Sequence, residues 1–202
     1  MAGKVFLFNR IAAVYGLFYN WQVRNYRCIL NNIKNQLDIS SYQSVIDIGC
    51  GTGALCKVLQ EYNLEVTGLD SADAMLAIAA KKTGITKPLE PSIRFIHSDV
   101  LKGLPIKNKS FDVAITSYVA HGLMPKERIA LYNEMKRIAK YTAILFDYNE
   151  QRSLITDIAE QLEGGDYFSF IRSIKDELMN QFGNLKVINT GKHSAIYICK
   201  IE

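Results

Sequence analysis

A glycine-rich turn carries the strongest chemical signal in the sequence. Its residues are Asp47, Ile48, Gly49, Cys50, Gly51, Thr52 and Gly53. The turn follows a short apolar run, Val45–Ile48, which is typical of a buried strand, and it precedes a helix expected over residues 54–62. Glycines in this position let a ligand approach the backbone closely, and the N-terminus of the helix lends positive potential. Three alternating glycines therefore predict a ligand site rather than a plain strand-to-helix turn.

Two classes of cofactor compete for this turn. Gly49, Gly51 and Ala54 satisfy the dinucleotide pattern GxGxx(G/A), which would make the turn a pyrophosphate site. Asp47 argues against a pyrophosphate, because its carboxylate stands where a dinucleotide-binding strand is normally apolar and would repel an anion. A carboxylate in an apolar strand is costly without a partner. S-adenosylmethionine carries an ammonium and a sulfonium, so Asp47 favours that cofactor over NAD.

Two further carboxylates follow the next two expected strands. Asp70 ends the strand expected over residues 64–69, about 20 residues past the turn, where a carboxylate can accept both hydroxyls of a ribose. Asp99 follows the strand expected over residues 92–97 and can meet an adenine amino group while Val100 packs on the ring. Each carboxylate could instead cap a helix or a loop. Since ligands of open parallel sheets bind at the carboxyl ends of strands, the series favours a ligand site.

The rest of the chain alternates between strand and helix. Ser71 is a plausible N-cap for a helix through Lys82, and Pro125 suits the first turn of a helix to about Lys140. Apolar strands separated by such helices predict a parallel sheet covered on both faces. A short polar turn near the C-terminus makes the last two strands an antiparallel pair. The remaining expected strands are residues 111–116, 142–146, 187–188 and 195–198.

The flanks of this alternating region are helical and aromatic. We expect helices over residues 5–37 and 151–182, the second of which ends at Gly183. Aromatic side chains from both flanks could line an apolar acceptor pocket, although side chains at helical spacing also suit a core. These candidates are Tyr15, Tyr19, Trp21, Tyr148, Tyr167 and Phe168.

In their order and spacing, these motifs resemble the class I S-adenosylmethionine-dependent methyltransferases, in particular the small-molecule branch described as methyltransferase type 11 or ubiquinone-biosynthesis-like. The likeness covers residues 45–146. It implies a Rossmann-like α/β fold: a seven-stranded, mostly parallel sheet with helices on both faces, a C-terminal antiparallel hairpin and a helical N-terminal lid. The matching motifs are Val45 to Gly53, Gly68-Leu69-Asp70-Ser71 with Met75-Leu76, Ser98-Asp99-Val100, Leu104-Pro105 and Ser110-Phe111-Asp112-Val113.

The resemblance implies S-adenosylmethionine as cofactor and S-adenosylhomocysteine as product. Asp47 and the glycines would hold the methionine moiety, Asp70 the ribose, and Asp99 with Val100 the adenine. Tyr15 would cover the cofactor, while Thr116 and Ser117 would line the methionine side near the methyl group. The cofactor-binding residues implied are Tyr15, Asp47, Gly49, Cys50, Gly51, Gly53, Asp70, Ser71, Met75, Asp99, Val100, Thr116 and Ser117.

Two positions depart from the family pattern. Gly16 stands where the family usually has Asp after the lid tyrosine, and residues 139–142 replace its Lys-Pro-Gly-Gly turn. Neither change touches the implied cofactor residues. We expect a single methyltransferase domain over residues 1–202. Its expected parts are a helical lid (1–40), a cofactor-binding core (41–147), a helical substrate-side insertion (148–183) and a β-hairpin (184–202).

Methyl transfer from a sulfonium is an in-line displacement, in which positioning supplies much of the rate. A general base is needed only for a nucleophile that is still protonated. The candidates beyond the fourth and fifth strands are Tyr118, His121, Asp147 and Tyr148. His121 is the best placed, four residues past Ser117, and Tyr148 is the second catalytic candidate; a structural histidine at a helix start is the competing role for His121.

Composition and missing motifs exclude other classes. Among 202 residues with a net charge of +4, the basic residues are scattered, the four cysteines form no CxxC pair, and the three histidines are dispersed. Neither a nucleic-acid patch nor a metal site is therefore expected. No apolar run approaches the ~18 residues of a membrane span and no secretory segment is evident, so we expect a cytoplasmic protein.

The acceptor class is argued from the fourth strand end. Residues 116–119 read Thr-Ser-Tyr-Val instead of the Asn/Asp-Pro-Pro-aromatic signature of nucleobase amine methylation. This favours a small-molecule acceptor over DNA. An RNA or protein methyltransferase on the same fold, and a non-catalytic cofactor-binding protein, are the alternatives. The chain is expected to be a monomer or a homodimer.

Overall fold

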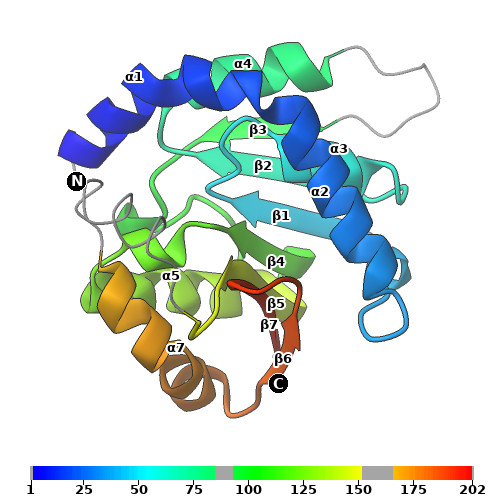
Figure 1. Ribbon diagram of the computed structural model, residues 1–202, viewed down its shortest axis with the longest axis vertical. Coiled ribbons are helices and arrows are strands. Elements are labelled where there is room, and N and C mark those ends of the chain that lie inside the picture. Colours follow the sequence, from blue (N-terminus) through cyan, green and yellow to red (C-terminus); the bar gives the residue numbers. More distant parts are fainter. Residues whose placement is uncertain (1, 85–92, 152–165, 202) are drawn as a thin grey trace. The chain divides into compact units, whose positions relative to one another are not determined.

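Figure 1 shows the protein as a computed structural model, which describes residues 2–84, 93–151 and 166–201. Seven strands form a sheet in the order β3-β2-β1-β4-β5-β7-β6, and β7 runs antiparallel to both of its neighbours. The predicted seven-stranded, mostly parallel sheet with a C-terminal antiparallel hairpin is therefore confirmed. Ser92, expected in the third strand, and the start of the helix expected over 151–182 lie outside the described residues.

The chain divides into two compact units, residues 1–99 and 100–202, which are described separately below. Its expected division into lid, core, insertion and hairpin stays a prediction. Among the described residues, no helix has the length and apolar character needed to cross a membrane. The described ranges also contain three short 3-10 helices: η1 (Ile39–Ser41), η2 (Val100–Lys102) and η3 (Ala120–Gly122).

The first unit contains three parallel strands whose carboxyl ends carry the predicted site. They are β1 (Ser44–Ile48), β2 (Glu65–Asp70) and β3 (Arg94–His97). In this register Asp47 lies beside Gly68 and Asp70 beside His97. The parallel pairing puts the ends of all three strands on one edge, as the alternating sequence pattern predicts.

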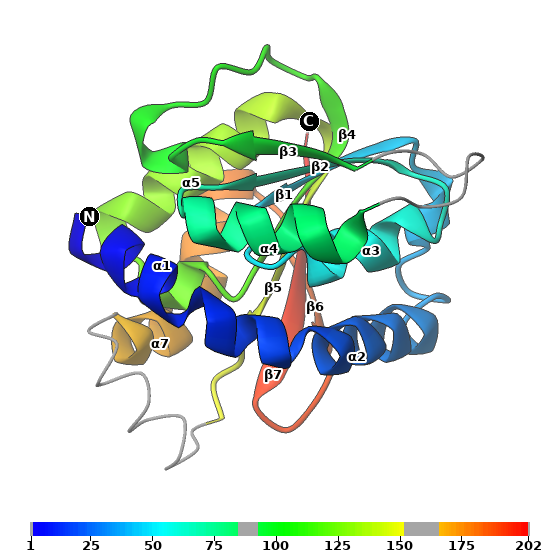
Figure 2. The ribbon, with the colours of Figure 1, turned by 90° about the horizontal axis from the view of Figure 1, so that it is seen from above.

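Two layers of helices build up the rest of the first unit. α3 (Ala54–Gln60) and α4 (Asp73–Thr83) follow β1 and β2 and pack on the strands. α1 (Ala2–Leu17) packs on α4, and α2 (Tyr19–Asn32) packs on α3 (Figure 2). The flank expected as one helical stretch is thus two helices that meet at Phe18 and end at Asn32, because each covers a different helix of the layer beneath.

The predicted cap of α4 was wrong. The N-cap residue is Ala72 instead of Ser71, and its side chain makes no capping hydrogen bond. The carboxylate of Asp70 instead accepts the backbone N–H of Ala72 at 2.9 Å. A carboxylate at the strand end already satisfies the backbone there, so the Ser71 hydroxyl is not needed as a cap.

The second unit contains the other four strands. They are β4 (Phe111–Ser117), β5 (Ala139–Tyr148), β6 (Lys186–Asn189) and β7 (Ser194–Lys200). α5 (Pro125–Ile138) begins at the predicted proline but ends two residues before Lys140. Its neighbour β5 starts early because Ala139 pairs with Phe111 of β4, which draws the residues expected at the helix end into the sheet.

The last helix of the second unit is α7 (Tyr167–Phe182), which packs against α5. Its buried face includes Phe170, Ile171, Ile174 and Leu178, whereas Phe168 is only half-buried. Gly183 ends the helix with a φ of +77°, a conformation that glycine adopts without strain, as the sequence predicts.

Candidate functional site

Asp47 is the most unusual residue of the first unit. The side chain is completely buried at the end of β1, and its Oδ2 accepts a hydrogen bond from the Cys56 thiol at 3.3 Å. Within the described residues, Oδ1 has no hydrogen-bond partner. Burial raises the pKa of Asp47 to about 7, with the charge of Asp70 adding to the rise and the Cys56 hydrogen bond opposing it. A buried oxygen without a partner is costly, so this atom suits a cationic or N–H-bearing ligand.

The glycine turn next to Asp47 leaves part of its backbone accessible to a ligand. Gly49, Gly51 and Gly53 have φ values of +76°, +52° and +75°, which only glycine adopts freely. A Cβ added at Gly51 would meet nothing within 4 Å, so a ligand can approach the backbone there. At Gly53 the same atom would come within 3.0 Å of the Ala79 Cβ, so that glycine also serves close helix packing.

The turn is fastened to the end of β2. The N–H groups of Gly49 and Cys50 both donate to the Leu69 carbonyl, at 2.7 and 2.9 Å. The Cys50 side chain is buried, so this residue turns its thiol inward and can offer a ligand only its backbone. The loop is therefore held in shape before any ligand arrives, as a pre-formed site requires.

Asp70 links the turn to α4. Its Oδ2 accepts the Gly51 N–H at 2.8 Å, and its Oδ1 accepts the Ala72 N–H at 2.9 Å. Burial raises the pKa of Asp70, although these backbone hydrogen bonds oppose the rise. Since Ser98 after β3 donates its N–H to the Asp70 carbonyl at 3.0 Å, the three strand ends are joined through this one residue. The first unit thus brings Asp47, the glycines and Asp70 together, as predicted.

The predicted lid residue lies next to this edge. Tyr15 on α1 packs against a small cluster that includes Ala72 and Met75, directly after Asp70. Asn9 accepts the Ala74 N–H at 3.0 Å and so anchors α1 to the first turn of α4. Two of the implied cofactor residues, Tyr15 and Met75, therefore belong to the same apolar group, and their contact with the cofactor stays a prediction.

The other implied cofactor residues lie on separate elements. Ser71 uses its carbonyl oxygen for a 3.0 Å hydrogen bond with His97 Nε2. Asp99 lies two residues beyond β3 and is half-buried. In the second unit, Val100 begins η2, and buried Thr116 and half-buried Ser117 end β4 beside Leu145 and Phe146. Their roles toward the cofactor stay predictions.

A buried histidine–aspartate pair lies beyond the strand ends of the second unit. His121 Nδ1 is 2.7 Å from Asp147 Oδ1, and the side chains are only 8% and 0% exposed. The carboxylate is further fixed by the backbone N–H groups of His121, at 3.3 Å, and Tyr148, at 2.9 Å. A carboxylate at Nδ1 requires a hydrogen there, so Nε2 is the nitrogen that accepts a proton when the ring is neutral.

Aromatic rings surround this pair. The Tyr148 ring lies 4.8 Å from the His121 ring, edge to face, and Tyr118 and Phe170 follow at 6.4 and 6.3 Å. Tyr118 has a φ of +52°, which is rare for a residue with a side chain and is typical of functional sites. Of the aromatic candidates for a pocket wall, Tyr167 contacts Tyr148 at 5.2 Å. Trp21 lies exposed on α2 in the first unit, and its place in a pocket wall stays a prediction.

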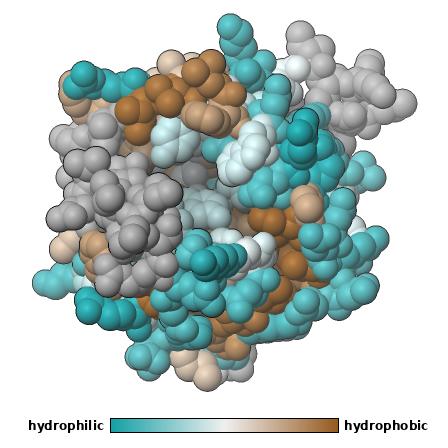
Figure 3. Space-filling view, in the orientation of Figure 1, coloured by the Kyte–Doolittle hydropathy of each residue, from teal (hydrophilic) through white to brown (hydrophobic). Residues whose placement is uncertain are grey.

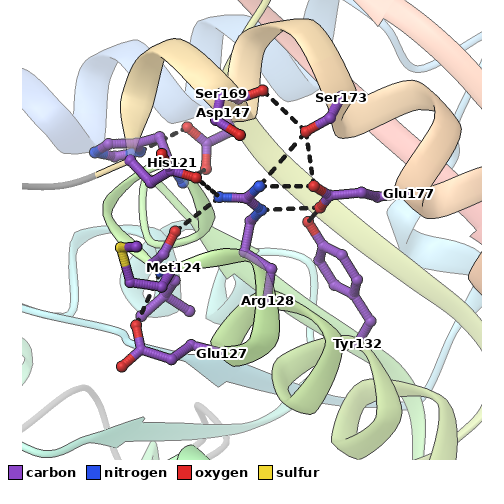
Figure 4. Close-up of polar contacts among 11 residues, drawn as sticks. His121, Met124, Glu127, Arg128, Tyr132, Asp147, Ser169, Ser173 and Glu177 are labelled. Carbon is purple, nitrogen blue, oxygen red and sulfur yellow. Dashed lines mark hydrogen bonds and ion pairs between the residues drawn. The ribbon is translucent and has the colours of Figure 1, made fainter.

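Sequence reasoning missed Arg128, a fully buried arginine on α5. Figure 4 shows its guanidinium pointing at Glu177 of α7, to which it donates two hydrogen bonds of 2.6 and 2.8 Å. It also donates to Asp166 Oδ2 at 2.9 Å and to the Leu123 carbonyl, two residues after His121, at 2.7 Å. The spacing of residues along α5 could have predicted its burial. Arg128 lies one helical turn before Tyr132, on the buried face of that helix.

We expect Arg128→Met to lower the free energy of unfolding by about 2–3 kcal/mol, because it leaves two largely buried carboxylates without their cation. The carboxylates of Asp166 and Glu177 keep about a fifth of their surface exposed, which reduces the loss below that of a fully buried pair. Urea unfolding would measure it. Arg27→Met is the control, since both side chains of its pair with Glu61 are much more exposed, at 44% and 34%, and the change should cost less than about 1 kcal/mol. Equal losses would contradict the role given to the Arg128 cluster.

The donor set at the edge of the first unit fits S-adenosylmethionine. The buried, unpartnered Oδ1 of Asp47 suits the ammonium of the methionine moiety, directly or through water, and repels a pyrophosphate. The open backbone at Gly51 admits a ligand next to the carboxylate of Asp70, an acceptor for ribose hydroxyls.

Comparison with known proteins agrees with this chemistry. Residues 45–142 match the family described as "Methyltransferase domain". A probable S-adenosylmethionine-dependent methyltransferase of Saccharomyces cerevisiae is 39% identical over 79 residues, which cover 39% of this chain and 27% of that protein. An uncharacterized methyltransferase of Staphylococcus carnosus is 26% identical over 206 residues, covering 92% and 93%.

Among solved structures, magnesium protoporphyrin IX methyltransferase from Synechocystis, crystallised with bound S-adenosylhomocysteine, has the same fold. The TM-score is 0.67 at 18% identity, over 88% of this chain and 84% of that one. The fold, the matched domain and the named relatives all agree with the motifs in the sequence. Residues 45–142 are therefore a methyltransferase domain of the class I S-adenosylmethionine-dependent kind.

Proposed function

We propose that this protein is a cytoplasmic enzyme that transfers the methyl group of S-adenosylmethionine to a small-molecule acceptor. The observation that carries the proposal is the buried, unpartnered Oδ1 of Asp47 beside a glycine turn whose backbone is open at Gly51. A buried anionic group of this kind needs a cation, and the glycine turn needs a ligand that approaches the backbone. The methionine end of the cofactor meets both needs.

The proposal assigns a part of the cofactor to each of the site residues in the first unit. Asp47 holds the ammonium group, the glycine turn lies along the methionine moiety, and Asp70 accepts the ribose hydroxyls. Tyr15 and Met75 pack beside the adenosine. When bound, S-adenosylmethionine supplies a methyl group on a positively charged sulfur. The residues therefore need only to bind and orient it, since alignment supplies much of the rate of such a displacement.

The second unit provides a candidate base for the acceptor. Asp147 holds the Nδ1 hydrogen of His121, so Nε2 can take the proton that a hydroxyl or N–H acceptor loses as it is methylated. The aromatic rings around His121, including those of Tyr118 and Tyr148, suit an apolar or aromatic acceptor. A small-molecule acceptor is also in keeping with the similar Synechocystis structure, which is that of a magnesium protoporphyrin IX methyltransferase.

Calorimetric titration of the wild type and Asp70→Asn tests the cofactor assignment. We expect the wild type to bind S-adenosylmethionine and S-adenosylhomocysteine but not NAD. The variant should bind both ligands roughly 10- to 100-fold more weakly, because a hydrogen bond to a charged group contributes about 1.5–3 kcal/mol.

Glu65→Gln is the matched control, since Glu65 is exposed at the opposite end of the same strand. Thermal unfolding of both variants checks that the fold is kept, because Asp70 also accepts the N–H groups of Gly51 and Ala72. An unchanged affinity in a folded Asp70→Asn variant would contradict the ribose contact, and binding of NAD alone would overturn the cofactor.

A further inference from the structure

An apolar stripe runs along the outer face of α1 and α2. Val14, Leu17, Phe18 and Trp21 are 53%, 83%, 56% and 64% exposed. Their spacing of three, one and three residues puts them on one side of the two nearly continuous helices. Figure 3 shows hydrophobic side chains gathered over α1. Exposed apolar side chains that cluster in this way mark an interaction surface more often than isolated ones do.

The stripe is not the core face of these helices. That face is formed by other residues, among them Ala12, Tyr19, Val23 and Leu30, which are buried. It packs on α4 and α3. α1 and α2 therefore have two apolar faces, and the packing within the first unit uses only one of them.

Positive charge accompanies the stripe. Residues 1–37 contain five Lys and Arg residues and no Asp or Glu. Arg24, one helical turn after Trp21, is exposed, and the Arg10 guanidinium lies 5.7 Å from the centre of the Phe6 ring. Arg27 forms an ion pair of 2.7 Å with Glu61, the residue that follows α3, so this acidic neighbour is already paired.

We propose that the stripe of Val14, Leu17, Phe18 and Trp21, with Arg10 and Arg24, docks the protein on an anionic lipid surface. Helices that lie in a membrane interface combine basic residues with Trp, Phe and Leu, and bind by burying the apolar side chains while anionic headgroups attract the cations. A second copy of the chain fits less well, because a two-fold contact through this face would bring the same arginines of both copies together.

Trp21 is the single tryptophan of the chain, so its fluorescence reports on this surface directly. The experiment titrates the full-length protein with vesicles of phosphatidylcholine alone or mixed with phosphatidylglycerol, at low and high salt. We expect a blue shift of the emission and co-sedimentation with the anionic vesicles only, both weakened by salt.

Leu17→Ser/Phe18→Ser keeps the fluorophore and should weaken vesicle binding at least tenfold, and Arg24→Glu should weaken it as well. Tyr141→Ser/Met179→Ser, which removes two exposed apolar side chains from residues 100–202, is the control and should bind like the wild type. An unshifted emission, binding that the stripe variants do not change, or a dimer in light scattering that Leu17→Ser/Phe18→Ser dissociates would each overturn the proposal. None of these readouts depends on cofactor binding or methyl transfer.

Discussion

Asp47→Asn is expected to be more stable than the wild type above pH 7, although it removes a residue of the proposed cofactor site. Burial raises the pKa of Asp47 to about 7 in the folded protein, against an ordinary value of 3.8. Between these values the folded state binds a proton that the unfolded state has lost, so the stability of the wild type falls as the pH rises through this window. The full loss is about 4 kcal/mol, since each pKa unit corresponds to about 1.4 kcal/mol.

Urea unfolding at pH 5, 6, 7 and 8 would measure this loss. The wild type should lose stability across the series relative to Asp47→Asn, which has no proton to lose. Cys56→Ala provides a second test, because the thiol hydrogen bond opposes the rise in the pKa of Asp47. Without this hydrogen bond the pKa of Asp47 should be higher, so the loss of stability should occur at higher pH. Parallel stability curves for the wild type and Asp47→Asn would contradict the buried, proton-binding carboxylate.

The same carboxylate should make cofactor binding depend on pH. In the proposed site the ammonium of S-adenosylmethionine would pair with ionised Asp47, so the affinity of the wild type should rise between pH 5 and pH 7, by at most tenfold per pH unit. Asp47→Asn should bind weakly throughout, with no such rise. The variant thus separates stability from binding. Its free energy of unfolding should be higher where the wild-type carboxylate is charged, while its affinity for the cofactor is lower because the ammonium has lost its carboxylate partner. A site that trades stability for binding in this way is common in proteins.

Local sequence patterns were sufficient for the fold and for the cofactor edge of the first unit. Short apolar runs that end in glycine or aspartate predicted β1 and β2, and the common edge of parallel strands then brought Asp47 and Asp70 together. Errors arose where a tertiary partner competes with a local rule. Ala139 pairs with β4 instead of extending α5, and the Asp70 carboxylate replaces Ser71 as the acceptor at the start of α4.

The pairs that tune the candidate site could not be predicted, because they join positions that are far apart in the sequence. Cys56 reaches Asp47 across nine residues, His121 reaches Asp147 across 26, and Arg128 reaches Glu177 across 49. Sequence reasoning gave His121 and Asp147 as separate candidates near two strand ends. Only the folded chain shows that the Asp147 carboxylate forms a hydrogen bond with the His121 ring.

His121→Asn should lower kcat by roughly 10²- to 10⁴-fold if the acceptor loses a proton during methylation, since this is the usual contribution of a general base. The rate of S-adenosylhomocysteine release, with an acceptor that the wild type methylates, would measure it. Affinity for S-adenosylmethionine should not change, because the cofactor contacts proposed above lie with the other residues. His193→Asn is the control, because within the described part of the chain the Nδ1 of that half-buried histidine lies 2.9 Å from the Gln151 carbonyl oxygen and not beside a carboxylate.

Asp147→Asn distinguishes a positioning residue from a merely structural one. The amide can still accept from Nδ1, but it no longer stabilises the positive imidazolium that forms when Nε2 takes a proton, so His121 becomes a weaker base. We therefore expect the lower limb of the pH–rate profile to move to lower pH and kcat to fall, with KM for the cofactor unchanged. A lower rate with an unmoved profile would make Asp147 a purely structural partner. Full activity in His121→Asn would mean that the acceptor presents a nucleophile that needs no base, such as a carboxylate or a neutral amine.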